Sequence, residues 1–207
     1  MKNVGLYLVC VSLFVCCGHY VLLPPAIDLL PYERVGLISF SVEEAEGHLD
    51  TIATQQFLQE ILYSQSGVQI IEIGDLEEVL SEIDKTRLDP DAAASIGERF
   101  GVSAYFYGSV QLSEVKPKID VIGLVQGGRV QAVFDMTVTA RMISTETGAT
   151  LWTDSIFREG NLAYLSMTRG GVPYFDVKDK NDEMNKMIED MIQELTRDFR
   201  PSKRRIK

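Results

Sequence analysis

The position of the cysteines constrains this chain more than any other feature of its sequence. All three lie in the first seventeen residues, at Cys10, Cys16 and Cys17, and residues 18–207 contain none. No disulfide can therefore close within residues 18–207, and with only two histidines the chain also lacks ligands for a structural metal site. The rest of the chain must fold around an apolar core, and its length and 45% hydrophobic content suit a single globular domain.

Residues 1–16 have the pattern of an export signal. The apolar run over residues 4–15 follows a single Lys2 and has the length of the hydrophobic region of a signal peptide. It is shorter than the roughly twenty apolar residues that span a bilayer. An uncleaved membrane anchor that continues through residues 20–23 is the alternative, but Gly18 and the two prolines after residue 23 interrupt it.

The sequence FVCCGH at residues 14–19 resembles the lipobox of bacterial lipoproteins. In that family a small residue precedes a cysteine that becomes acylated and begins the mature chain. Cys17 is the predicted lipidation site, because the Cys16 before it is smaller than the Val15 that precedes Cys16. Residue 18 is glycine rather than aspartate, and by resemblance to enterobacterial lipoproteins this points to the outer membrane.

The charge of the chain disfavours nucleic acid as a partner. The net charge is −10, whereas binding to phosphates needs clustered lysines and arginines. Residues 200–207 are the exception, because they carry five positive charges and no acid. We expect this basic tail to be a frayed, solvated end, with contact to an anionic lipid surface or an acidic partner as the alternative.

Apolar patterns divide the remainder into a linker and a domain. Residues 17–33 comprise the predicted acylated cysteine and a linker, which is punctuated by three prolines and expected to form no element of its own. The domain covers residues 34–199. Its predicted elements are strands over 35–40, 68–73, 102–110, 130–142 and 149–157, and helices over 50–66, 76–84, 90–100 and 184–199.

Three of these helices carry clear sequence signals. Asp75 with Glu78 three residues later forms a capping box, and Asp89 followed by proline predicts a second start. Gly101 predicts the end of that helix, with Ile96 and Phe100 facing the sheet. In the last helix three methionines recur at helical spacing, which predicts core packing rather than a binding groove.

The order of these elements and their local sequences resemble the CsgG family of curli-secretion lipoproteins. Its domain is shared with the amino-terminal domain of TolB and with the LpoB activators of penicillin-binding proteins. The resemblance covers most of residues 34–199. It is carried by residues 35–40, the strand-to-helix junction 68–80, residues 91–110 with their Tyr-Gly-Ser at 107–109, and residues 141–152 with Thr-Gly at 147–148.

The resemblance implies an α/β (α+β) domain, with a mixed sheet of about five strands and flanking helices, that acts by protein binding and assembly in the periplasm. It implies no chemistry. The sequence likewise has no nucleophile motif, phosphate loop or metal-spaced cluster, so we predict no catalytic, cofactor-binding or metal residues. The acidic residues within 43–46 are expected to be a solvated loop, and an exported hydrolase is only a remote alternative.

Two function classes compete. The first is an accessory outer-membrane lipoprotein that faces the periplasm and binds an envelope partner, with activation of a cell-wall synthase as a remote variant. The second is an oligomeric, pore-forming subunit of a curli-type channel, whose family carries two membrane hairpins. Residues 115–142 alternate well enough for such a hairpin, whereas residues 158–178 alternate only briefly. We expect both segments to be soluble, the first as a long hairpin and the second as a mobile connection.

Overall fold

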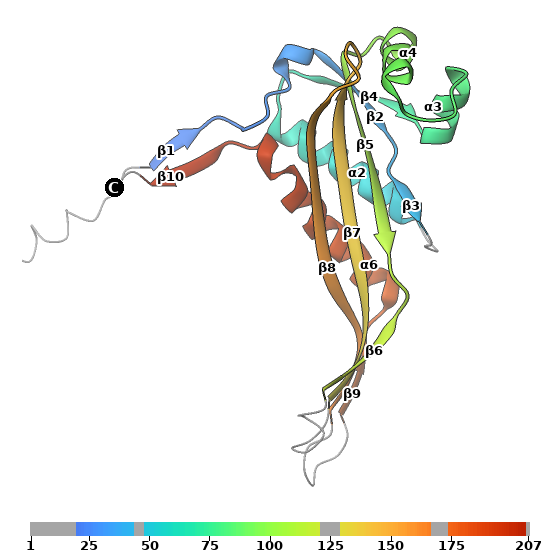
Figure 1. The fold of residues 1–207 in the computed structure, drawn as a ribbon. Coiled ribbons are helices and arrows are strands. Elements are labelled where there is room, and N and C mark those ends of the chain that lie inside the picture. The colour runs from blue at the N-terminus through green and yellow to red at the C-terminus, as the bar shows by residue number, and fades with distance from the viewer. Residues whose placement is uncertain (1–19, 44–47, 121–128, 167–173, 206–207) are drawn as a thin grey trace, which may run out of the picture.

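The computed structural model describes residues 20–43, 48–120, 129–166 and 174–205 (Figure 1). Cys17, the predicted lipidation site, lies outside these ranges, as do the predicted hairpin tips. The strands are β1 (Tyr20–Leu23), β2 (Arg34–Ile38), β3 (Ser41–Glu43), β4 (Gln69–Gly74), β5 (Ala104–Leu112), β6 (Lys116–Asp120), β7 (Arg129–Ser144), β8 (Thr150–Ser166), β9 (Tyr174–Val177) and β10 (Ser202–Arg205). The helices are α2 (Leu49–Ser64), α3 (Leu76–Glu82), α4 (Pro90–Phe100) and α6 (Lys180–Leu195), with 3-10 turns η1 (Leu30–Tyr32) and η2 (Thr196–Phe199).

The predicted mixed sheet with flanking helices is confirmed, but it is larger than expected. Eight strands form it in the order β4-β2-β5-β7-β8-β9, with β3 also beside β5 and β6 beside β7. The strand β2 runs parallel to β4 and β5, whereas β5, β7, β8 and β9 are antiparallel neighbours. The estimate of about five strands was too low because β7 and β8 have 16 and 17 residues, and the short strands β6 and β9 pair with their far ends.

Helices α2 and α6 cover one face of the sheet (Figure 1). The main hydrophobic core lies between this face and the two helices. The even-numbered residues of β7 from Phe134 to Met142 are buried in this core, as the alternation predicted. The methionine stripe of α6 is also core: Met184 and Met191 are almost fully buried. A second, smaller core lies on the opposite face, under α3 and α4.

The capping signals are confirmed by hydrogen bonds. The Asp75 side chain accepts from the backbone N–H of Glu78 at 2.8 Å, and the Asp89 side chain accepts from that of Ala92 at 2.9 Å. Gly101 ends α4 in the left-handed region, at φ +64°. Ile96 is buried as predicted, but Phe100 is only partly buried at the margin of the second core.

The expectations for the two ends of the domain are wrong. Residues 20–33 contain β1 and η1, and the basic tail contains β10, which pairs antiparallel with β1. Tyr20 lies opposite Arg205, and Leu23 lies opposite Ser202. We call this two-stranded ribbon the terminal arm; it projects away from the body of the molecule (Figure 1). The reason is tertiary, because buried contacts at Leu29 and Gln65 bring the two ends together.

Among the described residues, no helix is both long and apolar enough to cross a membrane.

Candidate functional site

Four strands extend the sheet beyond the helices. β6, the first residues of β7, the last residues of β8 and β9 lie side by side below the body of the molecule (Figure 1). We call this part, residues 116–120, 129–133, 161–166 and 174–177, the distal ribbon. It is continuous with the core sheet, because β7 and β8 run through both.

The pairing register gives the distal ribbon two unlike faces. Residues that lie directly opposite each other in antiparallel strands share a face, and alternate residues along a strand share it too. Ile119 lies opposite Val130, and Val130 lies opposite Leu165. The face that they share is apolar in all its described side chains: Pro117, Ile119, Val130, Ala132, Ala163, Leu165 and Val177. It continues the buried face of β7, and none of the described helices covers Ile119 or Val177 on it.

The opposite face of the ribbon is mainly polar. Its described side chains are Lys116, Lys118, Gln131, Val133, Asn161, Tyr164 and Asp176. Lys118 forms an ion pair with Glu159 of β8, with 2.6 Å between the Lys118 Nζ and Glu159 Oε1 atoms. On the apolar face, by contrast, the side chains of Ile119 and Val177 are 54% and 60% exposed. Exposed apolar groups gathered on one face are typical of a protein-binding or membrane-contacting surface.

The segment 158–178 is therefore a hairpin arm and not the mobile connection that we expected, at least where it is described. A β-bulge in β8 interrupts the alternation of apolar and polar residues in this segment, so the sequence pattern appears short. Ala132 pairs with Ala163 while Val133 pairs with Asn161, so Leu162 is an extra residue in β8. Even-numbered residues face the core before Leu162, and odd-numbered residues do so after it. The signal that could have revealed this is the Ala-x-Leu of residues 163–165 taken in its own register.

A second surface lies on the sheet face opposite α2 and α6, where α3 and α4 do not reach. It is formed by alternate residues of three strands: Tyr107, Ser109, Gln111, Thr137, Thr139, Arg141, Thr153, Ser155 and Phe157. A shallow cavity of about 280 Å³ lies between β5 and β7. Arg141 donates to the Tyr107 hydroxyl at 3.3 Å, and the Thr139 and Ser155 hydroxyls lie 2.9 Å apart. Phe157 is 63% exposed at its edge.

Gly108 of the Tyr-Gly-Ser sequence has a packing role under this surface. The Phe40 ring occupies the space that a side chain at residue 108 would need. Phe40 in turn contacts Phe57 of α2, with ring centroids 5.3 Å apart. Glycine is therefore required at this position by the close approach of an aromatic ring.

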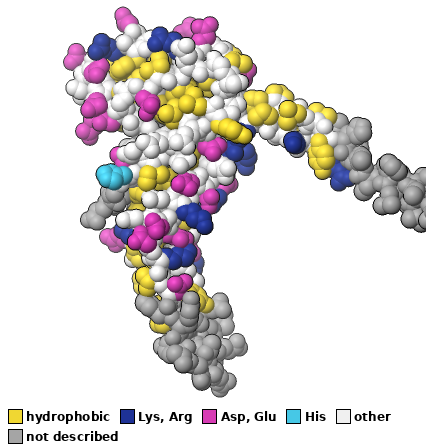
Figure 2. Space-filling view, turned by 180° about the vertical axis from the view of Figure 1, so that it is seen from behind, with side chains coloured by type: hydrophobic (Ala, Val, Ile, Leu, Met, Phe, Trp, Pro, Cys, Tyr) yellow, Lys and Arg dark blue, Asp and Glu magenta, His cyan; other side chains and the backbone are white. Residues whose placement is uncertain are grey.

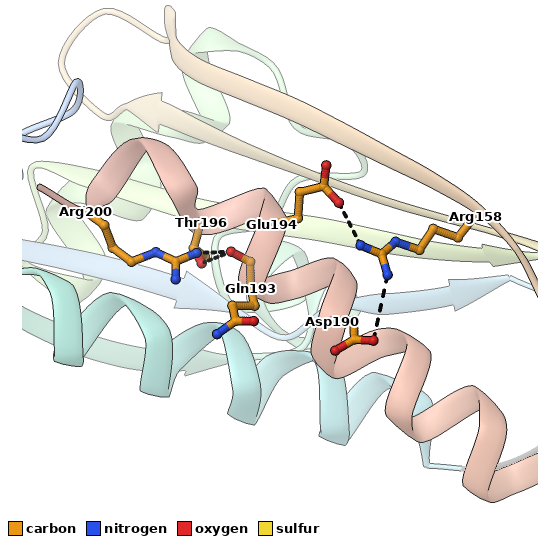
Figure 3. A network of polar contacts seen from close by, with 6 residues as sticks. All are labelled: Arg158, Asp190, Gln193, Glu194, Thr196 and Arg200. Atoms are coloured by element: carbon orange, nitrogen blue, oxygen red, sulfur yellow. Dashed lines mark hydrogen bonds and ion pairs between the residues drawn. The ribbon is translucent and has the colours of Figure 1, made fainter. Parts of the chain in front are cut away.

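A third site is a charged groove where α6 meets the terminal arm (Figure 3). Arg158 of β8 donates to Glu194 at 2.8 Å and lies 3.8 Å from Asp190, so it ties β8 to two turns of α6. Arg200 donates to the backbone carbonyl of Gln193 and lies 3.7 Å from Glu60. The groove holds about 740 Å³ and is widely open. Its carboxylates Asp190 and Glu194 are both paired with Arg158 at a partly exposed site, where ion pairs contribute little to stability.

The titratable groups with perturbed pKa values have structural causes. The backbone N–H of Ala92 lowers the pKa of Asp89, and burial raises the pKa of Tyr105 to about 12. Neither group lines the groove at α6 or the cavity between β5 and β7. Within the described part of the chain no group of three His, Cys, Asp or Glu side chains could hold a metal ion. Glu43 belongs to β3, and the rest of the acidic run lies outside the described residues.

Comparison with known proteins gives remote structural likeness only. No protein-family model matches the chain, and no curated protein matches it. The PelC dodecamer from Paraburkholderia phytofirmans is 14% identical, over 88% of this chain and 97% of that chain, with a TM-score of 0.46. The lipoprotein GNA1162 from Neisseria meningitidis is 14% identical over 62% of this chain and 83% of that one, with a TM-score of 0.39. The LpoB C-terminal domain from Salmonella enterica is 10% identical over 61% and 82%, with a TM-score of 0.38.

These structural neighbours thus include LpoB and a bacterial lipoprotein. TM-scores below 0.5 do not establish a common function, and membership of the CsgG family stays a prediction.

Proposed function

We propose that this chain is a lipid-anchored protein of the bacterial outer membrane that faces the periplasm and acts by protein binding and assembly, not by catalysis. The observation that supports this most is the apolar face of the distal ribbon. It presents aliphatic side chains from four strands on one surface, and Ile119 and Val177 on it are more than half exposed. Leaving a face of this kind in water is unfavourable, and a partner that covers it stabilises the complex by roughly 25 cal/mol for each Å² of apolar surface buried.

The edge of the ribbon suggests how the partner binds. β6 is an outer strand, and it carries Lys116, Pro117 and Lys118. Lysine and proline on an outer strand oppose the addition of another strand. We therefore infer that the partner contacts the apolar face rather than extending the sheet beside β6.

The test uses two neighbouring residues that point to opposite faces of one strand. A photo-crosslinking amino acid replaces Ile119 on the apolar face or, as the matched control, Lys118 on the polar face. Both positions are about half exposed: residue Ile119 is 54% exposed, and the side chain of Lys118 is 56% exposed. We expect protein adducts from position 119 and few from position 118 in intact cells. Absence of protein adducts from both positions would refute the proposed binding surface.

A pore-forming subunit is the second candidate, and the same two faces favour it. Transmembrane β-hairpins alternate apolar residues toward lipid with polar residues toward water, and the ribbon strands follow that alternation. In this case the photo-reactive group at position 119 would label lipid instead of protein. Ile119→Arg would then cost about 2 to 4 kcal/mol of insertion if the residue lies near the bilayer midplane. Single-channel conductance lost in Ile119→Arg, and kept in Gln131→Arg on the polar face, would place the pore first.

The anchor itself depends on Cys17, which is the last cysteine in the chain. We propose that Cys17→Ser prevents acylation and releases the protein from the membrane fraction, because one attachment point carries all the lipid. Incorporation of a labelled fatty acid and sedimentation measure the two effects. A Cys17→Ser protein that still takes up the label would contradict the lipid anchor.

A further inference from the structure

Every residue of the terminal arm is exposed. All eight residues of Tyr20–Leu23 and Ser202–Arg205 are exposed to solvent, and among the strands that the structure describes these two pair only with each other. An isolated two-stranded ribbon is marginally stable in water at best. The hydrogen bonds of Gln65 fix the base of this ribbon, and a further surface along its length would stabilise the rest.

The composition of the arm specifies that surface. β1 contributes Tyr20, Val21, Leu22 and Leu23, of which Tyr20 is 64% and Leu22 63% exposed. β10 contributes Lys203, Arg204 and Arg205. The register places Tyr20 opposite Arg205 and Leu22 opposite Lys203 on one face, and Val21 opposite Arg204 on the other. Each face of the arm therefore carries both apolar and basic side chains, and Figure 2 shows the two kinds side by side on the arm in one view.

The basic side chains of the arm have no acidic partner among the described residues. The ion pairs nearest along the chain use Arg200 and Arg158, not residues 203–205. These charges also stand against a net charge of −10 for the whole chain. An anionic surface is complementary to the arm and repels most of the rest of the protein.

We propose that the terminal arm lies on an anionic phospholipid surface, with the apolar side chains of one of its mixed faces in the interfacial region and the cations of β10 near lipid phosphates. Tyrosine favours the membrane–water interface, and lysine and arginine favour anionic headgroups. An acidic protein would explain the cations but not the exposed aliphatic residues beside them. This inference concerns a different surface from the distal ribbon, and it does not depend on what the ribbon binds.

Fluorescence of a tryptophan in the arm tests the contact. Tyr20→Trp is introduced in the full-length protein, where the native Trp152 is only 7% exposed and gives a constant background. The protein is added to vesicles with brominated acyl chains, made of phosphatidylcholine alone or with phosphatidylglycerol. We expect stronger quenching with phosphatidylglycerol, and we expect salt to weaken it.

The charge requirement is tested by replacing Lys203, Arg204 and Arg205 with glutamine. Each basic side chain contributes roughly five-fold to binding at an anionic surface, so the triple variant should lose about 100-fold in apparent vesicle affinity. The control, with glutamine at Lys85, Lys180 and Lys186, removes the same charge elsewhere and should bind as the unchanged protein does. A charge-preserving variant, Lys203→Arg with Arg204→Lys and Arg205→Lys, should also bind normally.

Three results would overturn the proposal. They are equal quenching in both kinds of vesicle, an equal loss of binding in the two glutamine variants, and a self-association without lipid that only the arm variant removes. The last result would mean that a second copy of the chain covers the arm.

Discussion

Gln65 joins both ends of the domain to α2, and its replacement by methionine tests whether this junction positions the terminal arm. The residue is 6% exposed and lies just after the helix. Its Oε1 atom accepts from the backbone N–H of Leu29 at 3.1 Å. Its Nε2 atom donates to the backbone carbonyls of Ile27 at 3.0 Å and Phe199 at 2.6 Å. The segment that follows β1 and the segment that precedes β10 are thereby both hydrogen-bonded to one side chain.

Methionine has nearly the volume of glutamine, so the change opens no large cavity and the main effect is the loss of three hydrogen bonds. Each bond contributes about 0.5 to 1.5 kcal/mol net, and Gln65→Met should therefore lower the free energy of unfolding by about 3 kcal/mol. For a domain of this size that corresponds to roughly 6 to 12 °C in melting temperature. Hydrogen exchange of the Leu29 amide should also become faster, because its acceptor is lost.

Urea unfolding followed by circular dichroism measures the free energy, with Gln59→Met as the control. Gln59 is exposed on the same helix, so the same substitution there should change the stability by less than about 0.5 kcal/mol. A loss below about 1 kcal/mol in Gln65→Met would refute the view that this side chain fixes the two ends.

Three further changes test the fold. Asp89→Ala should lower the melting temperature, because α4 loses its cap. The backbone N–H of Ala92 lowers the pKa of Asp89, so the stabilisation by this cap is present above the ordinary pKa of the carboxyl and is lost as the pH falls through the lowered pKa, which acid unfolding measures. Burial raises the pKa of Tyr105 from 10.0 to about 12. The contribution of the neutral, buried phenol to the free energy of unfolding is therefore full below pH 10 and is lost as the pH rises toward 12. Tyr105→Phe should remove a tyrosinate absorbance step near pH 12. Phe106→Ala should cost about 3 to 5 kcal/mol in a thermal melt, since its ring contacts three other buried rings, whereas the exposed Phe157→Ala should cost under about 0.5 kcal/mol.

The sequence correctly predicted features that depend on residues close together in the chain, namely helix caps and the spacing of apolar residues. The caps at Asp75 and Asp89 are confirmed because a side chain within the same turn satisfies the first free N–H groups of each helix. The inward residues of β7 and the methionine stripe of α6 are confirmed as well, because one covered face imposes its period on the sequence. For the candidate site, the first arm of the distal ribbon was foreseen in the alternation of residues 115–142.

The second arm of the ribbon could not be assigned correctly from its own sequence. The bulge at Leu162 exchanges the two faces of β8, and it is defined only by the pairing of β8 with β7. Beyond Leu162, alternation counted from the first part of β8 therefore assigns each residue to the wrong face. The apolar face becomes visible only once the four strands are placed in register.

The sequence by itself determined both ends of α4, the start of α3, the inward face of β7, the absence of cysteine after residue 17 and the basic character of residues 200–207. It placed the last helix at 184–199, whereas α6 covers Lys180–Leu195, because the polar first turn of α6 carries no apolar stripe. Only the tertiary structure decided that the basic tail and the presumed linker pair with each other. Each strand of the terminal arm has four residues, which is too short for a periodic pattern to be recognised. Their pairing follows from buried hydrogen bonds at Gln65 and between Ile27 and Asp198, which bring opposite ends of the chain together. Such long-range contacts leave no local trace in the sequence, because their energy arises only when the core is formed.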